Sequence, residues 1–306
     1  MGEIKRITHH IGGAYWTGGA DRVGDVYNPA TGKVTGQVEF ASASVVDHAV
    51  DVATAAQVEW RSASLAKRVQ VLFSFREILN ARKEEVAKLI TAEHGKVLSD
   101  ALGEVTRGLE VVEFACGIPH LLKGEYTEGA GPGIDIYATR QPLGIVAGIT
   151  PFNFPAMIPM WMFGIAIACG NAFILKPSEK DPSLPVRLAE LMLEAGAPEG
   201  LLNVVHGDKE AVDAVLHHPD IKAVSFVGSS DIAQYVYSTG AANGKRVQAN
   251  GGAKNYIVIM PDADIGKTVE ALSTAAFGCA GERCMAGSTA VTVGAAAERL
   301  LPDLIA

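Results

Sequence analysis

Cys284 is the residue whose surroundings best suit a nucleophile. It stands in Gly281-Glu282-Arg283-Cys284-Met285, after an apolar run of helical pattern at 274–278 and before a strand-like run at 289–293. A cysteine at the end of an element and close to a guanidinium is favoured as the thiolate, the nucleophilic form. The alternative is a small buried core residue, because free cysteine is among the most buried residue types.

Asn153 is a second residue that could act on a carbonyl group. It is enclosed by aromatic rings and prolines in Pro151-Phe152-Asn153-Phe154-Pro155. A rigidly held amide can donate a hydrogen bond to the oxyanion that develops when a nucleophile attacks a carbonyl. The alternative is an Asx turn, in which the side chain bonds nearby backbone.

An alternation of apolar strands and helical patterns begins at residue 144 and must position these groups. It indicates an α/β fold class with a parallel, Rossmann-like sheet, in which ligands bind at the carboxyl ends of the strands. The expected strands cover 145–149, 172–176, 202–206 and 223–227, and the expected helices cover 158–168, 184–195, 209–216 and a segment from about 230.

Several polar residues follow those strands directly. Lys176 and Glu179 in Lys176-Pro177-Ser178-Glu179 could both reach the ribose hydroxyls of a dinucleotide. Gly228 and Ser229 lie where a helix N-terminus would suit a pyrophosphate. Each could also be a simple turn. A Gly251-Gly252 pair would allow close approach of a ligand, or make a plain turn between strands.

The N-terminal part shows short strands within 8–40, with a turn at 28–32, and then helices. The helical patterns begin near Ser44 and cover 65–79, 83–94 with Gly95 as C-cap, and 97–116. The last of these carries Arg107. The alternation at 134–140 predicts a half-buried ribbon.

Composition limits the class of protein. The 306 residues are 48% hydrophobic and 20% charged, which is typical of a globular α/β protein with one large core or two domains. A net charge of −8 argues against a general nucleic-acid or anionic-membrane surface. The four cysteines form no Cys-x-x-Cys motif, so we expect no metal site, and their scatter fits a reducing cytosol and a cytoplasmic location.

Two segments bear on targeting and membranes. The N-terminus has neither an apolar signal core nor an Arg-rich transit pattern. The almost uncharged run 154–175 is long enough to cross a bilayer, but Pro155, Pro159 and the Gly170-Asn171 turn favour a buried helix followed by a buried strand.

In this order, the blocks Pro151–Pro155, Lys176–Glu179 and Arg283–Ala286 resemble the aldehyde dehydrogenase superfamily. The chain is most similar to the CoA-acylating branch that acts on methylmalonate and malonate semialdehyde. The resemblance implies an NAD-binding domain over 1–123 and 142–250, a bridging and oligomerisation ribbon over 124–141, and the start of a catalytic domain over 251–306. It also implies a homotetramer, and an aldehyde dehydrogenase fold that is C-terminally incomplete in this chain.

The resemblance implies a role for individual residues. Cys284 would form a thiohemiacetal, with the Asn153 side chain and the Cys284 backbone N–H as the oxyanion hole. Hydride would then pass to NAD and leave a thioacyl enzyme. The positions that would line the NAD site are Thr150, Phe152, Lys176, Glu179, Lys180, Ser229 and Gly251. Of these, Lys180 stands where this branch often has arginine, and Gly251 stands at a variable position.

Position 250 separates the branches of the family. Hydrolytic members carry glutamate there as the base for a water, whereas Asn250 cannot take up a proton. Hydrolysis should then be slow, which leaves the thioester for CoA as co-substrate. Alternatively, Asn250 is a turn residue and another group acts as base.

Arg107 and Arg283 complete the expected site. Their guanidiniums could hold the substrate carboxylate that is later lost as CO₂, which would give acetyl-CoA or propionyl-CoA. Alternatively, Arg107 is a solvated helix residue and Arg283 lowers the thiol pKa. The expected partners are thus a small semialdehyde and CoA, without nucleic acid or membrane. Two other hypotheses remain open: a hydrolytic aldehyde dehydrogenase, and an inactive NAD-binding relative.

Overall fold

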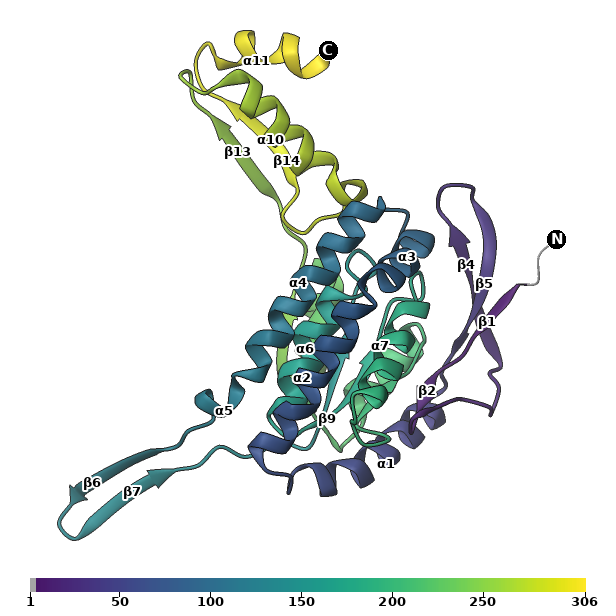
Figure 1. Ribbon diagram of the computed structural model, residues 1–306, viewed down its shortest axis with the longest axis vertical. Coiled ribbons are helices and arrows are strands. Elements are labelled where there is room, and N and C mark those ends of the chain that lie inside the picture. The colour runs from purple at the N-terminus through teal and green to yellow at the C-terminus, as the bar shows by residue number, and fades with distance from the viewer. Residues whose placement is uncertain (1–3) are drawn as a thin grey trace.

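A seven-stranded sheet forms the centre of the protein (Figure 1). The computed structural model describes residues 4–306. The strand order is β12-β11-β8-β9-β10-β2-β3, and the pairs from β12 to β10 are all parallel. This confirms the predicted parallel sheet. The strands are β2 (His10–Ile11), β3 (Ala14–Tyr15), β8 (Ile145–Ile149), β9 (Ala172–Lys176), β10 (Leu202–Val204), β11 (Ile221–Val227) and β12 (Arg246–Asn250).

Helices surround this sheet, and every residue of β8 and β9 is buried between them. Burial on both faces explains why these strands read as continuous apolar runs rather than as alternations. The expected strand 202–206 ends two residues early, at Val204. The helices are α1 (Ala43–Trp60), α2 (Leu65–Ala81), α3 (Lys83–His94), α4 (Leu98–Cys116), α5 (Ile118–Leu121), α6 (Met157–Ala168), α7 (Ser183–Glu194), α8 (Lys209–His217) and α9 (Ser230–Ala242).

Two of these helices, α4 and α6, pack closely together beside the expected site. A Cβ at Gly108 of α4 would lie 2.0 Å from Cε of Met160 in α6, so a larger residue there would force the Met160 side chain to move. Beneath them, Phe163 of α6 makes edge contacts with Phe75 of α2 and Phe173 of β9. The run 154–175 therefore forms α6 and β9, as predicted. In the described residues, 4–306, no helix is both long and apolar enough to cross a membrane.

A small three-stranded sheet precedes α1, which confirms the strands expected within 8–40. It consists of β1 (Lys5–Ile7), β5 (Lys33–Phe40) and β4 (Arg22–Asn28), in that spatial order. Ile7, Val26 and Val38 make its core. We call the two sheets and helices α1–α9 the body.

The ribbon of β6 (Glu125–Gly131) and β7 (Ile134–Ala138) projects from the body (Figure 1). The prediction of a half-buried ribbon is wrong, because every residue of β7 is exposed. Tyr126, Ile136 and Tyr137 are 64%, 56% and 76% exposed. The alternation of apolar and polar residues correctly indicates a strand, but in the described chain nothing packs on either face of it.

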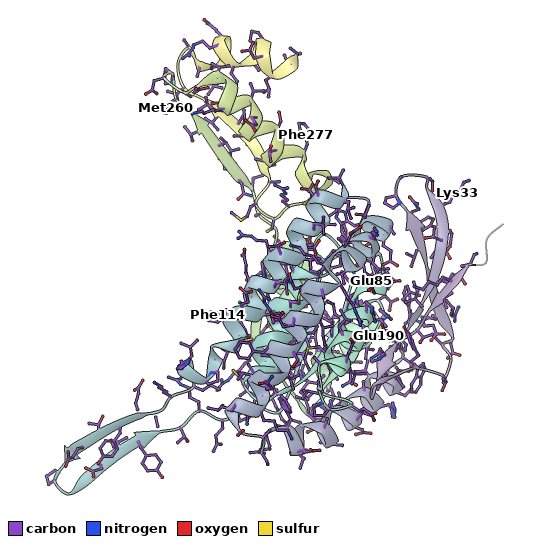
Figure 2. The ribbon with its side chains drawn as sticks, viewed as in Figure 1. Lys33, Glu85, Phe114, Glu190, Met260 and Phe277 are labelled. Carbon is purple, nitrogen blue, oxygen red and sulfur yellow. The ribbon has the colours of Figure 1, made fainter. Side chains whose placement is uncertain are left out.

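Residues 251–306 form a second projection, which we call the arm (Figure 1). Its parallel strands lie beside two helices, and its core of Ile259, Leu272, Ala296 and Leu300 is separate from the core of the body. Figure 2 shows Met260 and Phe277 on the arm, and they are 51% and 76% exposed. The arm comprises β13 (Asn255–Ile259), α10 (Ile265–Phe277), the 3₁₀ helix η1 (Gly278–Gly281), β14 (Gly287–Thr292) and α11 (Ala296–Ile305).

Candidate active site

Cys284 lies in the turn between η1 and β14, with its side chain exposed. Asn255, the first residue of β13, holds this turn from the arm. Its Nδ2 donates to the carbonyl oxygens of Cys284 (2.9 Å) and Ala286 (3.1 Å). The thiol is therefore accessible, while Asn255 fixes the backbone that follows it.

The backbone just before Cys284 takes an unusual conformation. Cys279 and Ala280 have φ of 53° and 57°, in the left-handed region that residues other than glycine seldom adopt. Asp100 of α4 stabilises this segment, because Oδ2 accepts from the Cys279 backbone N–H (2.8 Å) and Oδ1 accepts from Arg283 (2.9 Å). The side chain of Cys279 packs on Phe154 and Met157 of the body. The segment 282–286, which we call the Cys284 turn, is thus attached to the body.

Asn153 joins the same turn from the loop between β8 and α6. Its Nδ2 donates to the carbonyl oxygen of Glu282 at 2.5 Å, a contact between residues 129 apart in sequence. An amide carries two N–H bonds, so one bond to Glu282 leaves a second N–H of Asn153 as a donor. The Oδ1 atom is buried without a hydrogen-bond partner in the described residues. The structure therefore brings together the two residues that the sequence singled out for carbonyl chemistry.

A cavity of about 840 Å³ opens between α4, α6 and the Cys284 turn. Arg107, Arg283 and Cys284 all line it, together with apolar side chains such as Trp161 and Met285. Its volume is in the range of small-molecule sites. An apolar wall with two guanidiniums suits a small aldehyde that carries a carboxylate.

The two arginines differ in their contacts. Arg107 is largely exposed and pairs with Glu110 one turn along α4 at 3.0 Å. Arg283 donates to Asp100 and, at 3.3 Å, to Sγ of Cys279. The guanidinium of Arg283 therefore contacts the thiol of Cys279 rather than that of Cys284, the neighbour expected from the sequence.

A second set of polar groups lies at the carboxyl edge of the large sheet. The chain order reverses between β8 and β11, which is where open α/β sheets bind ligands. Thr150 follows β8, and its Oγ1 is buried without a partner in the described chain. Lys176 ends β9 with Nζ 3.5 Å from a Glu179 oxygen, and burial lowers the pKa of Lys176.

The remaining expected cofactor residues border the same edge. Nζ of Lys180 lies 4.4 Å from the ring centre of Phe152. Ser229 is the N-cap residue of α9, yet its side chain makes no capping hydrogen bond. Gly251 packs against α9, since a Cβ there would lie 3.0 Å from Oγ of Ser230. Asn250 ends β12 beside Val227 and is exposed.

Comparison with known proteins identifies the family of the chain. A family model described as the aldehyde dehydrogenase family matches residues 16–306. The chain belongs to the aldehyde dehydrogenase family. Within curated relatives, it is 54% identical over 298 residues to malonate-semialdehyde dehydrogenase of Pseudomonas aeruginosa, covering 97% of this chain and 60% of that protein. It is 52% identical to malonate-semialdehyde dehydrogenase 2 of Geobacillus thermodenitrificans, covering 99% and 63%.

Solved aldehyde dehydrogenase structures share the fold. A Sinorhizobium meliloti protein named a methylmalonate-semialdehyde dehydrogenase, complexed with NAD, superposes with a TM-score of 0.98 at 58% identity, covering 100% of this chain and 62% of that one. The methylmalonate-semialdehyde dehydrogenase of Oceanimonas doudoroffii gives 0.96 at 53% identity, covering 98% and 62%. The chain thus spans about three fifths of the length of these relatives.

Some residues that shape this candidate site were not singled out from the sequence. They are Lys96, Asp100, Glu104 and Asn255. Asp100, Glu104 and Arg107 are spaced four and three apart, which places them on one face of α4. That spacing is a signal, but a charged helix face is usually solvated, so the sequence alone favours the surface interpretation.

Proposed function

We propose that the chain carries the active site for NAD-dependent oxidation of malonate or methylmalonate semialdehyde, with loss of CO₂ and transfer of the acyl group to CoA. The observation that carries this proposal is the hydrogen bond between Asn153 and the Cys284 turn, beside a cavity with two arginines. The names of the most similar relatives support the substrate class. Because the chain spans about three fifths of those relatives, the activity of the whole protein belongs to the proposal.

The proposed reaction begins at Cys284. Its thiolate attacks the aldehyde carbon, and the oxyanion receives hydrogen bonds from the second Asn153 N–H and from the Cys284 backbone N–H. NAD, when bound, supplies the acceptor for the hydride that leaves this carbon. What remains on Cys284 is a thioester.

The substrate carboxylate is then β to the thioester carbonyl. Its C–C bond can break with release of CO₂, because the thioester carbonyl accepts the electron pair as an enolate that Asn153 stabilises in the same way. Protonation of the carbon gives an acetyl or propionyl thioester. The CoA thiol displaces Cys284 from the acyl carbon, which regenerates the free thiol.

The residues at the carboxyl edge of the sheet fit NAD. Thr150 offers a buried hydroxyl without a partner, and Lys176 with Glu179 offers a cation and a carboxylate for ribose hydroxyls. Ser229 leaves the N-terminus of α9 free for phosphate. We assign Phe152, Lys180 and Gly251 to the same site.

Asn250 supports thiolysis over hydrolysis. It lies at the end of β12, and its amide side chain cannot accept a proton from water. A thioester on Cys284 would then persist until a thiol arrives. This feature favours CoA as the acyl acceptor.

The wider organisation of the protein is part of the proposal. We assign 1–123 and 142–250 to the NAD-binding domain, 124–141 to an oligomerisation ribbon and 251–306 to a catalytic domain. The exposed Tyr126, Ile136 and Tyr137 support a homo-oligomer joined through the ribbon. The cysteine pattern supports a cytoplasmic location.

The test is NADH formation from malonate semialdehyde and NAD by the 306-residue chain, with and without CoA. We expect one NADH per chain without CoA and steady turnover with it, and neither in Cys284→Ala. Steady turnover without CoA, yielding free acid, would contradict thiolysis and favour a hydrolytic enzyme. NAD binding without any NADH would favour an inactive relative.

A further inference from the structure

We propose that the buried ion pair of Lys96 and Glu104, which we call the brace, positions Asn153 for catalysis. Both side chains are 0% exposed, and Lys96 Nζ lies 2.8 Å from Glu104 Oε2. Nζ also donates to the backbone carbonyl oxygen of Asn153 at 2.6 Å. The inference rests on the proposed function, because it concerns Asn153 as the oxyanion donor.

The other oxygen of Glu104 holds the same loop farther along. Oε1 accepts from the backbone N–H groups of Ala156 (2.7 Å) and Met157 (3.2 Å). These N–H groups open α6 and have no partners within the helix. Between the two anchor points, Lys96 Nζ lies 4.1 Å from the ring centre of Phe154. The brace therefore contacts the segment 153–157 at both ends and in its middle.

This arrangement fixes Asn153 without touching its side chain. The loop that carries Asn153 follows β8. The brace holds this loop through Lys96, which precedes α4, and Glu104, which lies within α4. The amide must lie within hydrogen-bond distance of an oxyanion, and a displacement of about 1 Å can cost two orders of magnitude in rate. Lys96 and Glu104 are thus positioning residues that act through Asn153.

Stability alone is a weak explanation for such a pair. Replacing a buried ion pair by neutral groups of similar volume is often neutral or even stabilising, whereas removing one partner strands a buried charge. The double variant Lys96→Met, Glu104→Gln removes both charges together. Its glutamine oxygen can still accept from Ala156 and Met157, while the donor to the Asn153 carbonyl is lost. This variant separates positioning from stability.

The measurement compares two reactions of Cys284 on the full 306-residue chain, followed by mass spectrometry of the peptide that contains it. In the first, the thiolate attacks the carbonyl of p-nitrophenyl acetate and expels p-nitrophenolate, which leaves an acetyl thioester and passes through an oxyanion. In the second, the thiolate displaces iodide from iodoacetamide at a saturated carbon, without an oxyanion. Neither reaction needs NAD. The ratio of the two rates reports the oxyanion hole.

We expect the double variant to slow acetylation about tenfold or more at an unchanged alkylation rate, and Asn153→Ala to slow it about 10²-fold or more. Because the brace acts through Asn153, adding the double variant to Asn153→Ala should slow acetylation no further. Thermal unfolding should remain close to wild type. The matched control is Lys88→Met, Glu84→Gln, which removes an exposed Lys–Glu pair at 2.7 Å and should leave both rates unchanged.

Two results would overturn the positioning role: acetylation at the wild-type rate in the double variant, or a slowing that adds in full to that of Asn153→Ala. If Asn153→Ala itself acetylates normally, the oxyanion role in the proposed function fails, and the positioning role fails with it. Should the double variant not fold, the single variant Glu104→Gln tests the positioning role in its place. It keeps the oxygen that accepts from Ala156 and Met157 but replaces the oxygen that pairs with Lys96 by an NH₂ donor, so we expect a slowing of about two- to fivefold that disappears in the Asn153→Ala background.

Discussion

The body and the arm position chemical groups in different ways. In the body, buried parallel strands fix Thr150 and Lys176 through the backbone, since each directly follows or ends a strand. In the arm, the Cys284 turn is held by side chains that reach its backbone, namely Asp100, Asn153 and Asn255. The sheet edge with Thr150 and Lys176 therefore depends on the core, whereas the position of Cys284 depends on a few polar contacts.

The largest expected effect lies at Cys284. Cys284→Ala should abolish NADH formation, while NAD binding, which we assign to the body, stays unchanged. Single-turnover absorbance and equilibrium NAD titration measure the two properties. Cys116→Ala, which removes another thiol at the end of α4, should retain the NADH burst. Loss of NAD binding in Cys284→Ala would contradict the separation of the two regions.

A core substitution in each region tests their independence. Phe163→Ala in the body should lower the free energy of unfolding by about 3–5 kcal/mol, because it removes a ring that contacts Phe75 and Phe173. Leu272→Ala in the arm should cost about 2–5 kcal/mol. Since the two cores are separate, amide exchange in Leu272→Ala should rise in the arm alone. Faster exchange in β8 of that variant would show that the cores are coupled.

A pH effect is expected in the body from Asp181. Burial, with Glu93 nearby, raises the pKa of Asp181 to about 8, whereas an unfolded aspartate has a pKa of about 3.9. Between these pH values the folded state binds more protons than the unfolded state. Protonation of Asp181 therefore stabilises the folded state fully below about pH 4, and this contribution is lost as the pH rises towards 8. Asp181→Asn keeps the side chain neutral, and should unfold at a higher temperature than wild type above pH 8.

The pH dependence assigned to Asp181 is checked with a control variant, and Glu93 contributes to the same pH range. Asp51→Asn, at an exposed position on α1, should leave the pH profile of thermal unfolding as in wild type. Burial also raises the pKa of Glu93, so Asp181→Asn should flatten the profile between pH 5 and 8 without abolishing its slope. A profile identical to wild type would exclude Asp181 as the group that titrates.

The sequence predicted the body better than the ribbon of β6 and β7 for a physical reason. A continuous apolar run such as Ile145–Ile149 predicts that the strand is covered on both faces, because only such a strand buries every residue. The alternation at 134–138 predicts a strand but not whether another element covers one of its faces, so the prediction of half burial was wrong. Local pattern determines an element, but what covers it depends on distant parts of the chain.

The same distinction applies to the site. Cys284 and Asn153 were predicted because their neighbours in sequence are unusual, and the structure places them at one turn. Lys96 was not predicted to belong to the site, because the sequence around a buried lysine looks the same as that around a surface lysine. Its burial follows from the meeting of α4 with the loop before α6. Contacts between segments far apart in sequence were thus beyond local pattern.

The smallest expected effect tests how the arm is attached to the body. In Asp100→Asn, one carboxylate oxygen becomes an NH₂ group, so only one of the two bonds to Cys279 and Arg283 can persist. Left-handed backbone at Cys279 and Ala280 costs about 1–3 kcal/mol per residue and persists only when its surroundings enforce it. Losing a hydrogen bond to a charged group, worth about 1.5–3 kcal/mol, should therefore loosen the turn.

We expect faster amide exchange at 279–282 in Asp100→Asn, with β8 and β9 unchanged, and acetylation of Cys284 slowed by about two- to tenfold. Asp51→Asn again serves as the matched control, since it removes a carboxylate from a helix far from the turn in sequence. Unchanged exchange at 279–282 would mean that Asn153 and Asn255 suffice to hold the turn. The attachment of the Cys284 turn would then depend on these amides and on the packing of Cys279, and should be insensitive to salt, whereas an attachment through Asp100 and Arg283 should weaken as ionic strength rises.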